Sequence, residues 1–117
     1  MSTNPVPYPS LELDVSTQED SALVVVRGPL IGDTVNNFKS RVRELIPNAR
    51  RVAIDLSDVT YMDSSGLGAI VGVYVSAKTA HCDLQLINLN QQVRHLLGVT
   101  RLLTLFESCG QHNMKLP

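Results

Sequence analysis

Apolar and polar residues alternate near the start of the chain in the manner of β-strands. Residues 11–15 (LELDV) alternate apolar and polar side chains, which predicts a half-buried strand. Residues 22–27 (ALVVVR) are a β-branched run that Gly28 and Pro29 are expected to end. The polar residues 17–21 between these runs favour a turn, so the two strands are predicted to pair as a hairpin.

After this hairpin, the spacing of the apolar residues changes to the period of a helix and then back to that of a strand. A first helix is predicted to be capped by Asp33 and stopped by Pro47 with Asn48. Its apolar positions are Val35, Phe38, Val42, Leu45 and Ile46. Residues 51–56 (RVAIDL) predict a strand, and residues 57–62 are expected to connect it to the next helix.

The alternation of helix and strand continues beyond this connection. The segment 63–66 (DSSG) is predicted to open a second helix. The apolar stripe of this helix is Leu67, Ile70, Val71, Tyr74 and Val75. Residues 84–89 (LQLINL) predict a further strand, and a last helix is expected to begin near Asn90. Residues 102–107 fit either a short strand or a helix.

The order of these elements predicts an α/β fold in which helices pack on a mixed β-sheet. We expect roughly four to five strands and about four helices in this arrangement. A length of 117 residues fits one compact domain, which we place at residues 11–110. The prolines near the start predict an extended leader at residues 1–10, and residues 111–117 are predicted to form a tail.

Composition excludes several classes of function. Ten Lys and Arg residues stand against eleven Asp and Glu residues, and the formal charge of -1 argues against direct binding of nucleic acid. Cys82 and Cys109 lack the spacing of a zinc site or a disulfide framework, so we expect no metal and a cytoplasmic location. Cys82 precedes a predicted strand, so we expect its side chain to be packed. No apolar run reaches the length of about 18 residues that a membrane span requires.

The densest polar cluster surrounds the predicted start of the second helix. Its members are Asp55, Ser57, Asp58, Asp63, Ser64 and Ser65. Residues 52–90 contain one basic residue, Lys78, against the acids Asp55, Asp58, Asp63 and Asp83. This imbalance predicts a locally acidic surface. A serine at the mouth of a helix can carry a phosphate, which the helix dipole and free amides favour and nearby carboxylates oppose. The alternative is that Asp63 or Ser64 is an ordinary N-cap.

The segment 55–68 (DLSDVTYMDSSGLG) resembles the signature of the STAS domain found in bacterial anti-sigma-factor antagonists. The similarity extends back to the hairpin and forward through residues 93–106 (VRHLLGVTRLLTLF). It implies a STAS-type fold and a binding protein that is not an enzyme. In this family the first serine after the Met-Asp pair, here Ser64, is phosphorylated by a partner that is both anti-sigma factor and serine kinase. The unphosphorylated form binds that partner and frees the sigma factor, phosphorylation ends the binding, and a phosphatase resets the switch.

The resemblance also implies a set of partner-binding residues. They are Asp58, Met62, Asp63, Ser64, Ser65, Gly66 and Leu67. Asp58 and Asp63 are expected to shape the docking surface, and Ser65 to help set the start of the helix. Gly66 and Gly68 are expected to let a partner backbone approach closely.

The sequence departs from the family pattern at one position near this site. Family members usually carry an acid after the Gly-x-Leu that follows the second strand, where it is thought to help contact with the kinase. Here that position is Ile31, and the nearest acid is Asp33, two residues further on.

The enzymatic alternatives lack their motifs. A nucleophile elbow requires G-x-S-x-G, and neither Ser64 nor Ser65 has both glycines. The three histidines, His81 among them, fit surface or helix-end positions better than the position of a general base. The Gly-x-Gly at residues 66–68 is followed by no P-loop lysine, so we expect no nucleotide site and no cofactor.

Two alternatives of another kind remain. The chain could be a STAS subunit that is never phosphorylated, as in a lipid-transport ATPase complex or a stress-sensing assembly, and the neighbouring genes would distinguish the two cases. The second alternative concerns the basic residues on and after the first helix. They are Lys39, Arg41, Arg43, Arg50 and Arg51. We interpret them as a solvated face, with a second interaction surface as the alternative.

Overall fold

The computed structural model describes residues 10–101. Its strands are β1 (Glu12–Gln18), β2 (Ser21–Leu30), β3 (Arg51–Met62) and β4 (Asp83–Ile87). Its helices are α1 (Val35–Leu45), the short 3-10 helix η1 (Ile46–Asn48), α2 (Ser64–Thr79) and α3 (Gln91–Val99). The predictions for residues 1–9, 102–107 and 111–117, and for Cys109, lie outside the described residues.

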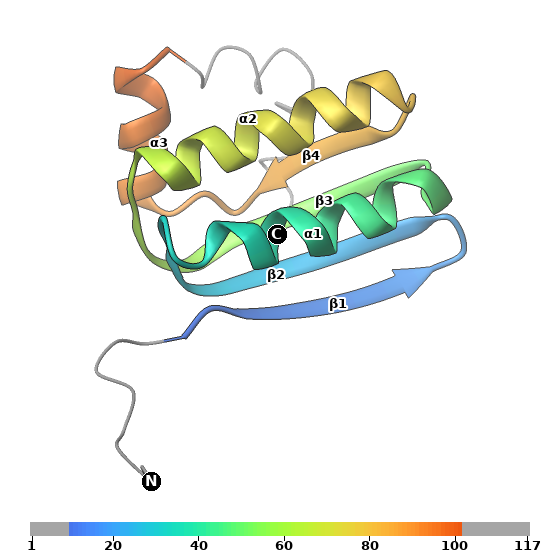
Figure 1. Ribbon diagram of the computed structural model, residues 1–117, viewed down its shortest axis with the longest axis horizontal. Helices are drawn as coiled ribbons and strands as arrows, with labels where there is room; N and C mark the ends of the chain where they lie inside the picture. Colours follow the sequence, from blue (N-terminus) through green and yellow to red (C-terminus); the bar gives the residue numbers. More distant parts are fainter. Residues whose placement is uncertain (1–9, 102–117) are drawn as a thin grey trace, which may run out of the picture.

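The strands form one mixed sheet in the order β1-β2-β3-β4. β1 pairs with β2 in the antiparallel sense, as the predicted hairpin, whereas β2, β3 and β4 run parallel. Helices α1 and α2 lie side by side over the same face of the sheet, and α3 contacts β3 (Figure 1). This arrangement confirms the predicted α/β fold with a mixed sheet. Within residues 10–101, the four strands lie in the predicted range and the three α-helices are one fewer than expected.

The core lies between the sheet and helices α1 and α2. Alternate residues of the central strands are buried, because successive side chains of a strand point to opposite faces. The largest of the buried core residues include Val24, Val26, Val52, Ile54, Leu56 and Leu86 of the sheet, and Phe38, Val42, Ile70 and Val73 of the two helices. The strands β2 and β3 run parallel and their last residues pair with each other, so both strands end at the same edge of this core. Helices α1 and α2 begin at that edge.

Both central strands extend further than their sequence pattern predicts. β2 continues through Gly28 and Pro29 to Leu30, and β3 includes residues 57–62, which were assigned to a connection. Two register shifts keep the strands paired across these residues. Gly28 has a φ of 105°, and a Cβ there would lie 2.6 Å from the carbonyl oxygen of Ser10. The glycine therefore accommodates an irregular strand and does not end it.

Two features of the helices differ from the prediction: the N-cap residue of α1, and the side of α2 that is buried. Thr34, not Asp33, is the N-cap residue of α1, and its hydroxyl donates a hydrogen bond to the carbonyl oxygen of Pro29 at 2.8 Å. In α2, Val75 of the predicted stripe is 55% exposed, whereas Val73 is fully buried. Because apolar residues occur on more than one side of this helix and no charged residue precedes Lys78 within it, its periodicity does not indicate which side the sheet covers. Between residues 10 and 101, no helix is both long and apolar enough to cross a membrane.

Candidate functional site at the start of helix α2

The ends of β2 and β3 meet the starts of α1 and α2 at one edge of the sheet. Leu30 and Met62 form the last register pair of the two parallel strands. Residues 31–34, which lead into α1, therefore lie beside the start of α2. The carboxyl ends of parallel strands are a common place for binding sites in α/β folds. The predicted contact residues 62–67 lie at this edge.

Asp63 connects the start of α2 to the loop before α1 through two hydrogen bonds. It is the N-cap of α2, because its Oδ1 accepts a hydrogen bond from the backbone N–H of Gly66 at 3.0 Å. Its Oδ2 accepts one from the backbone N–H of Gly32, in the loop before α1, at 3.4 Å. Of the two candidates for the N-cap of this helix, Asp63 is therefore the cap and Ser64 is not. Ser64 is the first residue of α2, and the side chains of Ser64 and Ser65 are exposed.

Gly66 is required by packing inside the domain. A Cβ on this residue would overlap the carbonyl oxygen of Leu30 and would lie 2.8 Å from Cγ of Met62. Gly66 is buried, so the absence of a side chain serves the close packing of α2 on β2 and not the approach of a partner. Gly68 differs from it, because Gly68 is exposed and no described atom lies within 4 Å of where its Cβ would be.

The predicted contact residues divide into an accessible and a buried set. Asp58, Ser64 and Ser65 are exposed and Asp63 is half-buried, while Met62, Gly66 and Leu67 are buried. The buried set packs into the core beneath the helix start. Only the accessible set can touch another molecule, and the buried set fixes the backbone that presents it.

The four acids within residues 52–90 do not form one acidic surface. Asp83 begins β4 at the other end of the sheet, where its carboxylate lies 3.5 Å from Nε of Arg51. The carboxylate of Asp58 lies 3.5 Å from Nε of Arg27, which also bonds Asp14 at 2.6 Å. The hydrogen bond that Arg27 donates to Asp14, together with the charges of the nearby carboxylates, raises the pKa of Arg27. Strand pairing brings Arg27 to the site from β2, so counting charges along the segment missed it.

Asp55 is engaged within the sheet edge. Its Oδ1 accepts hydrogen bonds from the backbone N–H of Ser57 at 2.9 Å and from the Ser57 hydroxyl at 2.8 Å. Its Oδ2 accepts one from the side-chain amide of Asn88, just after β4, at 2.9 Å. Partial burial acts to raise the pKa of Asp55, but these hydrogen bonds, helped by the charge of Arg27, outweigh it and lower the pKa. The ionised carboxylate therefore ties β3 to the residue that follows β4.

Asn90 attaches α3 to the same part of β3. Its Oδ1 accepts a hydrogen bond from the backbone N–H of Val93 at 2.8 Å, which caps α3. Its Nδ2 donates one to the carbonyl oxygen of Val59 at 2.8 Å. The sequence pattern placed the start of this helix correctly. It could not indicate the bond to Val59, because the two residues are 31 positions apart.

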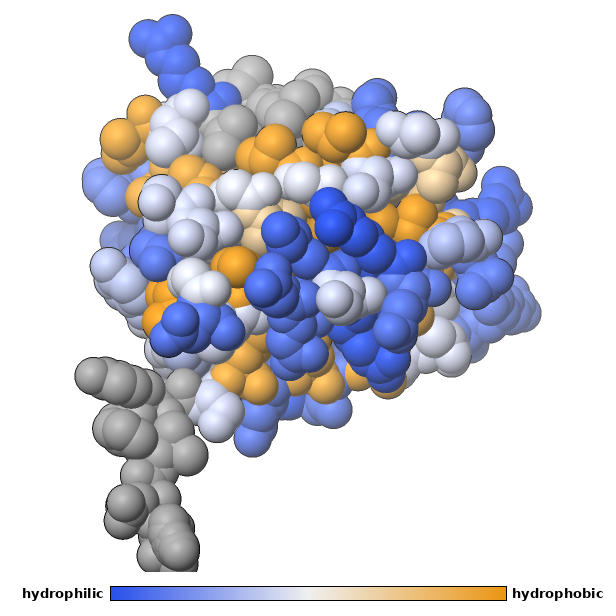
Figure 2. Space-filling model, viewed as in Figure 1, coloured by the Kyte–Doolittle hydropathy of each residue, from blue (hydrophilic) through white to orange (hydrophobic). Residues whose placement is uncertain are grey.

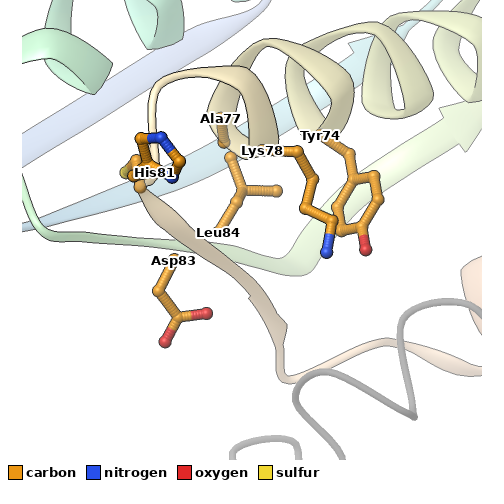
Figure 3. Close-up of a pocket in the computed structure, with 7 residues that line it drawn as sticks. Tyr74, Ala77, Lys78, His81, Asp83 and Leu84 are labelled. Carbon is orange, nitrogen blue, oxygen red and sulfur yellow. The ribbon is translucent and has the colours of Figure 1, made fainter.

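A cavity of about 550 Å³ lies at the other end of α2 (Figure 3). It is lined by Tyr74, Ala77, Lys78, His81, Cys82, Asp83 and Leu84. Lys78 is roughly 20 Å along the helix from Ser64, from the usual rise per residue, so His81 is too distant to act as a base for that serine. Cys82 is packed as predicted, and burial raises the pKa of its thiol. This cavity includes none of the predicted contact residues.

Comparison with known proteins identifies the family. Residues 12–114 match the STAS domain, and the chain belongs to the STAS domain family. The chain is 31% identical over 103 residues to the anti-sigma-B factor antagonist of Staphylococcus aureus, with 86% of each chain covered. It is 29% identical over 93 residues to that of Bacillus subtilis, covering 80% of this chain and 85% of that protein. The solved structure of the Bacillus cell fate determinant SpoIIAA in the phosphorylated form matches with a TM-score of 0.65 at 16% identity, covering 81% of this chain and 86% of that one. The family match confirms the resemblance found in residues 55–68.

Proposed function

We propose that this chain is an anti-sigma-factor antagonist that binds an anti-sigma factor with serine kinase activity and is released when Ser64 is phosphorylated. The observation that carries the proposal is the position of Ser64, which has an exposed side chain at the first residue of α2 while Asp63 provides the cap. The curated relatives named anti-sigma-B factor antagonists and the phosphorylated form of SpoIIAA support it. By this proposal the chain is a cytoplasmic binding protein, not an enzyme, and uses no cofactor.

A phosphate on Ser64 is compatible with the fold but unfavourable in an interface. The start of α2 carries a partial positive charge and backbone N–H groups that favour an anion. A phosphoserine adds about 1.5 to 2 negative charges, next to the carboxylate of Asp63 and near the loop that carries Asp33. Solvent accommodates this charge in the free protein. In a docked complex the phosphate would lose that solvent and would repel any facing acid.

The accessible and buried residues have different proposed roles. Asp58, Asp63, Ser64 and Ser65 form the contact surface, and Met62, Gly66 and Leu67 hold it in place from beneath. A phosphatase would remove the phosphate and restore binding. By this proposal, phosphorylation of the single hydroxyl of Ser64 switches binding without a change of fold.

The test is a calorimetric titration of the purified cognate anti-sigma factor with the variants Ser64→Ala and Ser64→Glu. Like-charge contacts in interfaces cost several kcal/mol, so we expect Ser64→Glu to weaken binding at least about tenfold. Ser64→Ala should bind like wild type and stay bound in the presence of Mg-ATP. The matched pair Ser65→Ala and Ser65→Glu controls for a general effect of charge at the helix start.

Mass spectrometry after incubation with the partner and Mg-ATP provides the second readout. We expect one phosphate, on the peptide that contains Ser64. Equal affinity of Ser64→Ala and Ser64→Glu, or a phosphate found only on Ser65, would overturn the switch. A partner that binds but never phosphorylates the chain would favour the STAS subunit that is not phosphorylated.

A further inference from the structure

The outer side of helix α2 carries small, uncharged residues and one exposed large hydrophobic residue, Val75. No charged residue occurs from Ser64 to Ala77. On the outer side Val75 is 55% exposed and Val71 is half-buried. Surface helices normally carry charged residues on the side that faces water, so a long uncharged side is typical of a helix that another surface covers. Within residues 10–101, α1 and the sheet leave the outer side of α2 uncovered.

Two glycines make this outer side flat. No described atom lies within 4 Å of the Cβ position of Gly68. The Cβ position of Gly72 lies 3.7 Å from Nη2 of Arg43, so the guanidinium of Arg43 lies beside α2. Each glycine in a helix interior costs about 1 kcal/mol relative to Ala. The flat surface is therefore not explained by the stability of the helix itself.

The flank of α1 that faces α2 is basic. Lys39 and Arg43 are four residues apart, so they lie on the same side of α1, and the contact of Arg43 with Gly72 shows that this side faces α2. Arg41 lies on the opposite flank and pairs with Glu44 at 3.2 Å. Among the described residues, no carboxylate forms an ion pair with Lys39 or Arg43. Figure 2 shows strongly hydrophilic residues gathered over α1, next to a paler band over α2.

We propose that the docking surface at Ser64 continues along the outer side of α2 and is bordered by Lys39 and Arg43, which bind carboxylates of the anti-sigma factor. This inference rests on the proposed function. Helical spacing places Ser64, Gly68 and Val75 on one side of α2, so the extension is continuous with the helix start. Because Lys39 and Arg43 form no ion pair within residues 10–101, we expect the partner to present carboxylates to them, beside a strip that packs on the uncharged side of α2. For Lys39 and Arg43, this proposal replaces the interpretation that the basic residues of the first helix form only a solvated face.

The charge component is tested by the double variant Lys39→Glu/Arg43→Glu, titrated against the purified cognate anti-sigma factor at two salt concentrations. We expect affinity to fall at least tenfold at low salt, and the salt dependence of binding to decrease, because screening acts on exposed charge pairs. Arg41→Glu is the matched control on the other flank of α1. Its affinity should stay within twofold of wild type. Equal effects of the two changes would overturn the assignment of this flank.

The flat surface is tested by Gly68→Gln, with Gly98→Gln in α3 as its matched control. Both glycines lie within helices, and no described atom lies within 4 Å of either Cβ position. Both variants should be at least as stable as wild type to urea, because Gln is the better helix former. Only Gly68→Gln should weaken binding, by about tenfold. Wild-type affinity for Gly68→Gln would overturn the α2 part of the extension.

The same titrations distinguish failure of this inference from failure of the proposed function. If wild type does not bind the anti-sigma factor, the proposed function is wrong and the extension is wrong with it. If wild type binds and Ser64→Glu does not, while Lys39→Glu/Arg43→Glu and Gly68→Gln bind like wild type, only the extension is overturned.

Discussion

The Cα atom of Gly66 faces the carbonyl oxygen of Leu30 so closely that no side chain fits between them. This contact packs the first turn of α2 against the end of β2. It holds the residues that carry the site, Asp63 and Ser64, at a fixed position relative to the loop before α1. The glycine in the signature segment is therefore a requirement of the fold at this edge.

Replacing Gly66 with Ala should destabilise the protein strongly. The methyl group would overlap backbone, which cannot move as a flexible side chain can, so we expect a loss of about 1–3 kcal/mol or more in the free energy of unfolding. Gly68→Ala is the matched control two residues away and should be neutral or stabilising by up to about 1 kcal/mol. Urea unfolding followed by circular dichroism measures both. The same unfolding midpoint for the two variants would contradict the packing described for Gly66.

Asn90 should contribute to stability through two separate hydrogen bonds. Asn90→Ala removes the cap of α3 and the bond to the carbonyl of Val59, and we expect a cost of about 2 kcal/mol. Asn90→Asp keeps an oxygen that can cap Val93 but places a carboxylate opposite the Val59 carbonyl. Because Asp and Asn cap helices about equally well, Asn90→Asp should be neutral if the residue acts as a cap alone. We expect it to be clearly destabilised in urea unfolding.

The stability that Asp55 contributes should depend on pH. The pKa of Asp55 is lowered in the folded protein, so its contribution is complete above the ordinary carboxyl pKa of about 3.9 and is lost as the pH falls through the folded pKa. The difference in unfolding free energy between wild type and Asp55→Asn should therefore be constant from pH 7 to pH 5 and should shrink below about pH 4.

Ser57→Ala provides a check on the cause of this pH dependence. It removes one of the three donors to Asp55, the hydroxyl, and keeps the backbone N–H of residue 57 and the side-chain amide of Asn88. In the Ser57→Ala background, the additional change Asp55→Asn should therefore alter the free energy of unfolding by an amount that depends less on pH. The comparison is with the same change, Asp55→Asn, made in the wild-type protein. Urea titrations at pH 7, 5, 4 and 3 measure both. An unchanged dependence would show that the Ser57 hydroxyl does not lower this pKa.

Local sequence patterns predicted which helices and strands form in this fold better than they predicted where each one begins and ends. The alternation in residues 11–15 and the helix starts at residues 63–66 and near Asn90 are local signals, and each was placed correctly. The extension of β3 through residues 57–62 was not, because a register shift interrupts the alternation and the partner strand lies far away in the sequence. Val75 was assigned to the buried side because apolar residues occur on more than one side of α2.

The candidate site shows the same division between local and long-range information. The motif identified Ser64 at a helix start, and the structure places it there with an exposed side chain. The burial of Met62 could not be inferred, because it depends on how α2 packs on β2. The ion pair of Asp58 with Arg27 was missed because it joins residues on neighbouring strands.

The loop before α1 places an acid beside the site although Ile31 stands where relatives were expected to carry one. Gly32 donates its backbone N–H to Asp63, and its Cβ position lies 3.7 Å from Oγ of Ser65. Asp33, the next residue, is exposed at this edge. We therefore expect Asp33 to supply the carboxylate that assists contact with the kinase.

Asp33→Asn should slow phosphorylation of Ser64 by about tenfold, which corresponds to about 1.4 kcal/mol in the barrier. Binding of the unphosphorylated protein should change much less. Asp20→Asn is the matched control, because Asp20 is also exposed but lies in the turn between β1 and β2, where it pairs with Arg50 at 3.7 Å. The initial rate of phosphate incorporation with Mg-ATP measures the effect. Adding Ile31→Asp to Asp33→Asn should restore part of the rate, because a carboxylate two residues earlier remains in the same loop. Phosphorylation of Asp33→Asn at the wild-type rate would show that the kinase does not use this carboxylate.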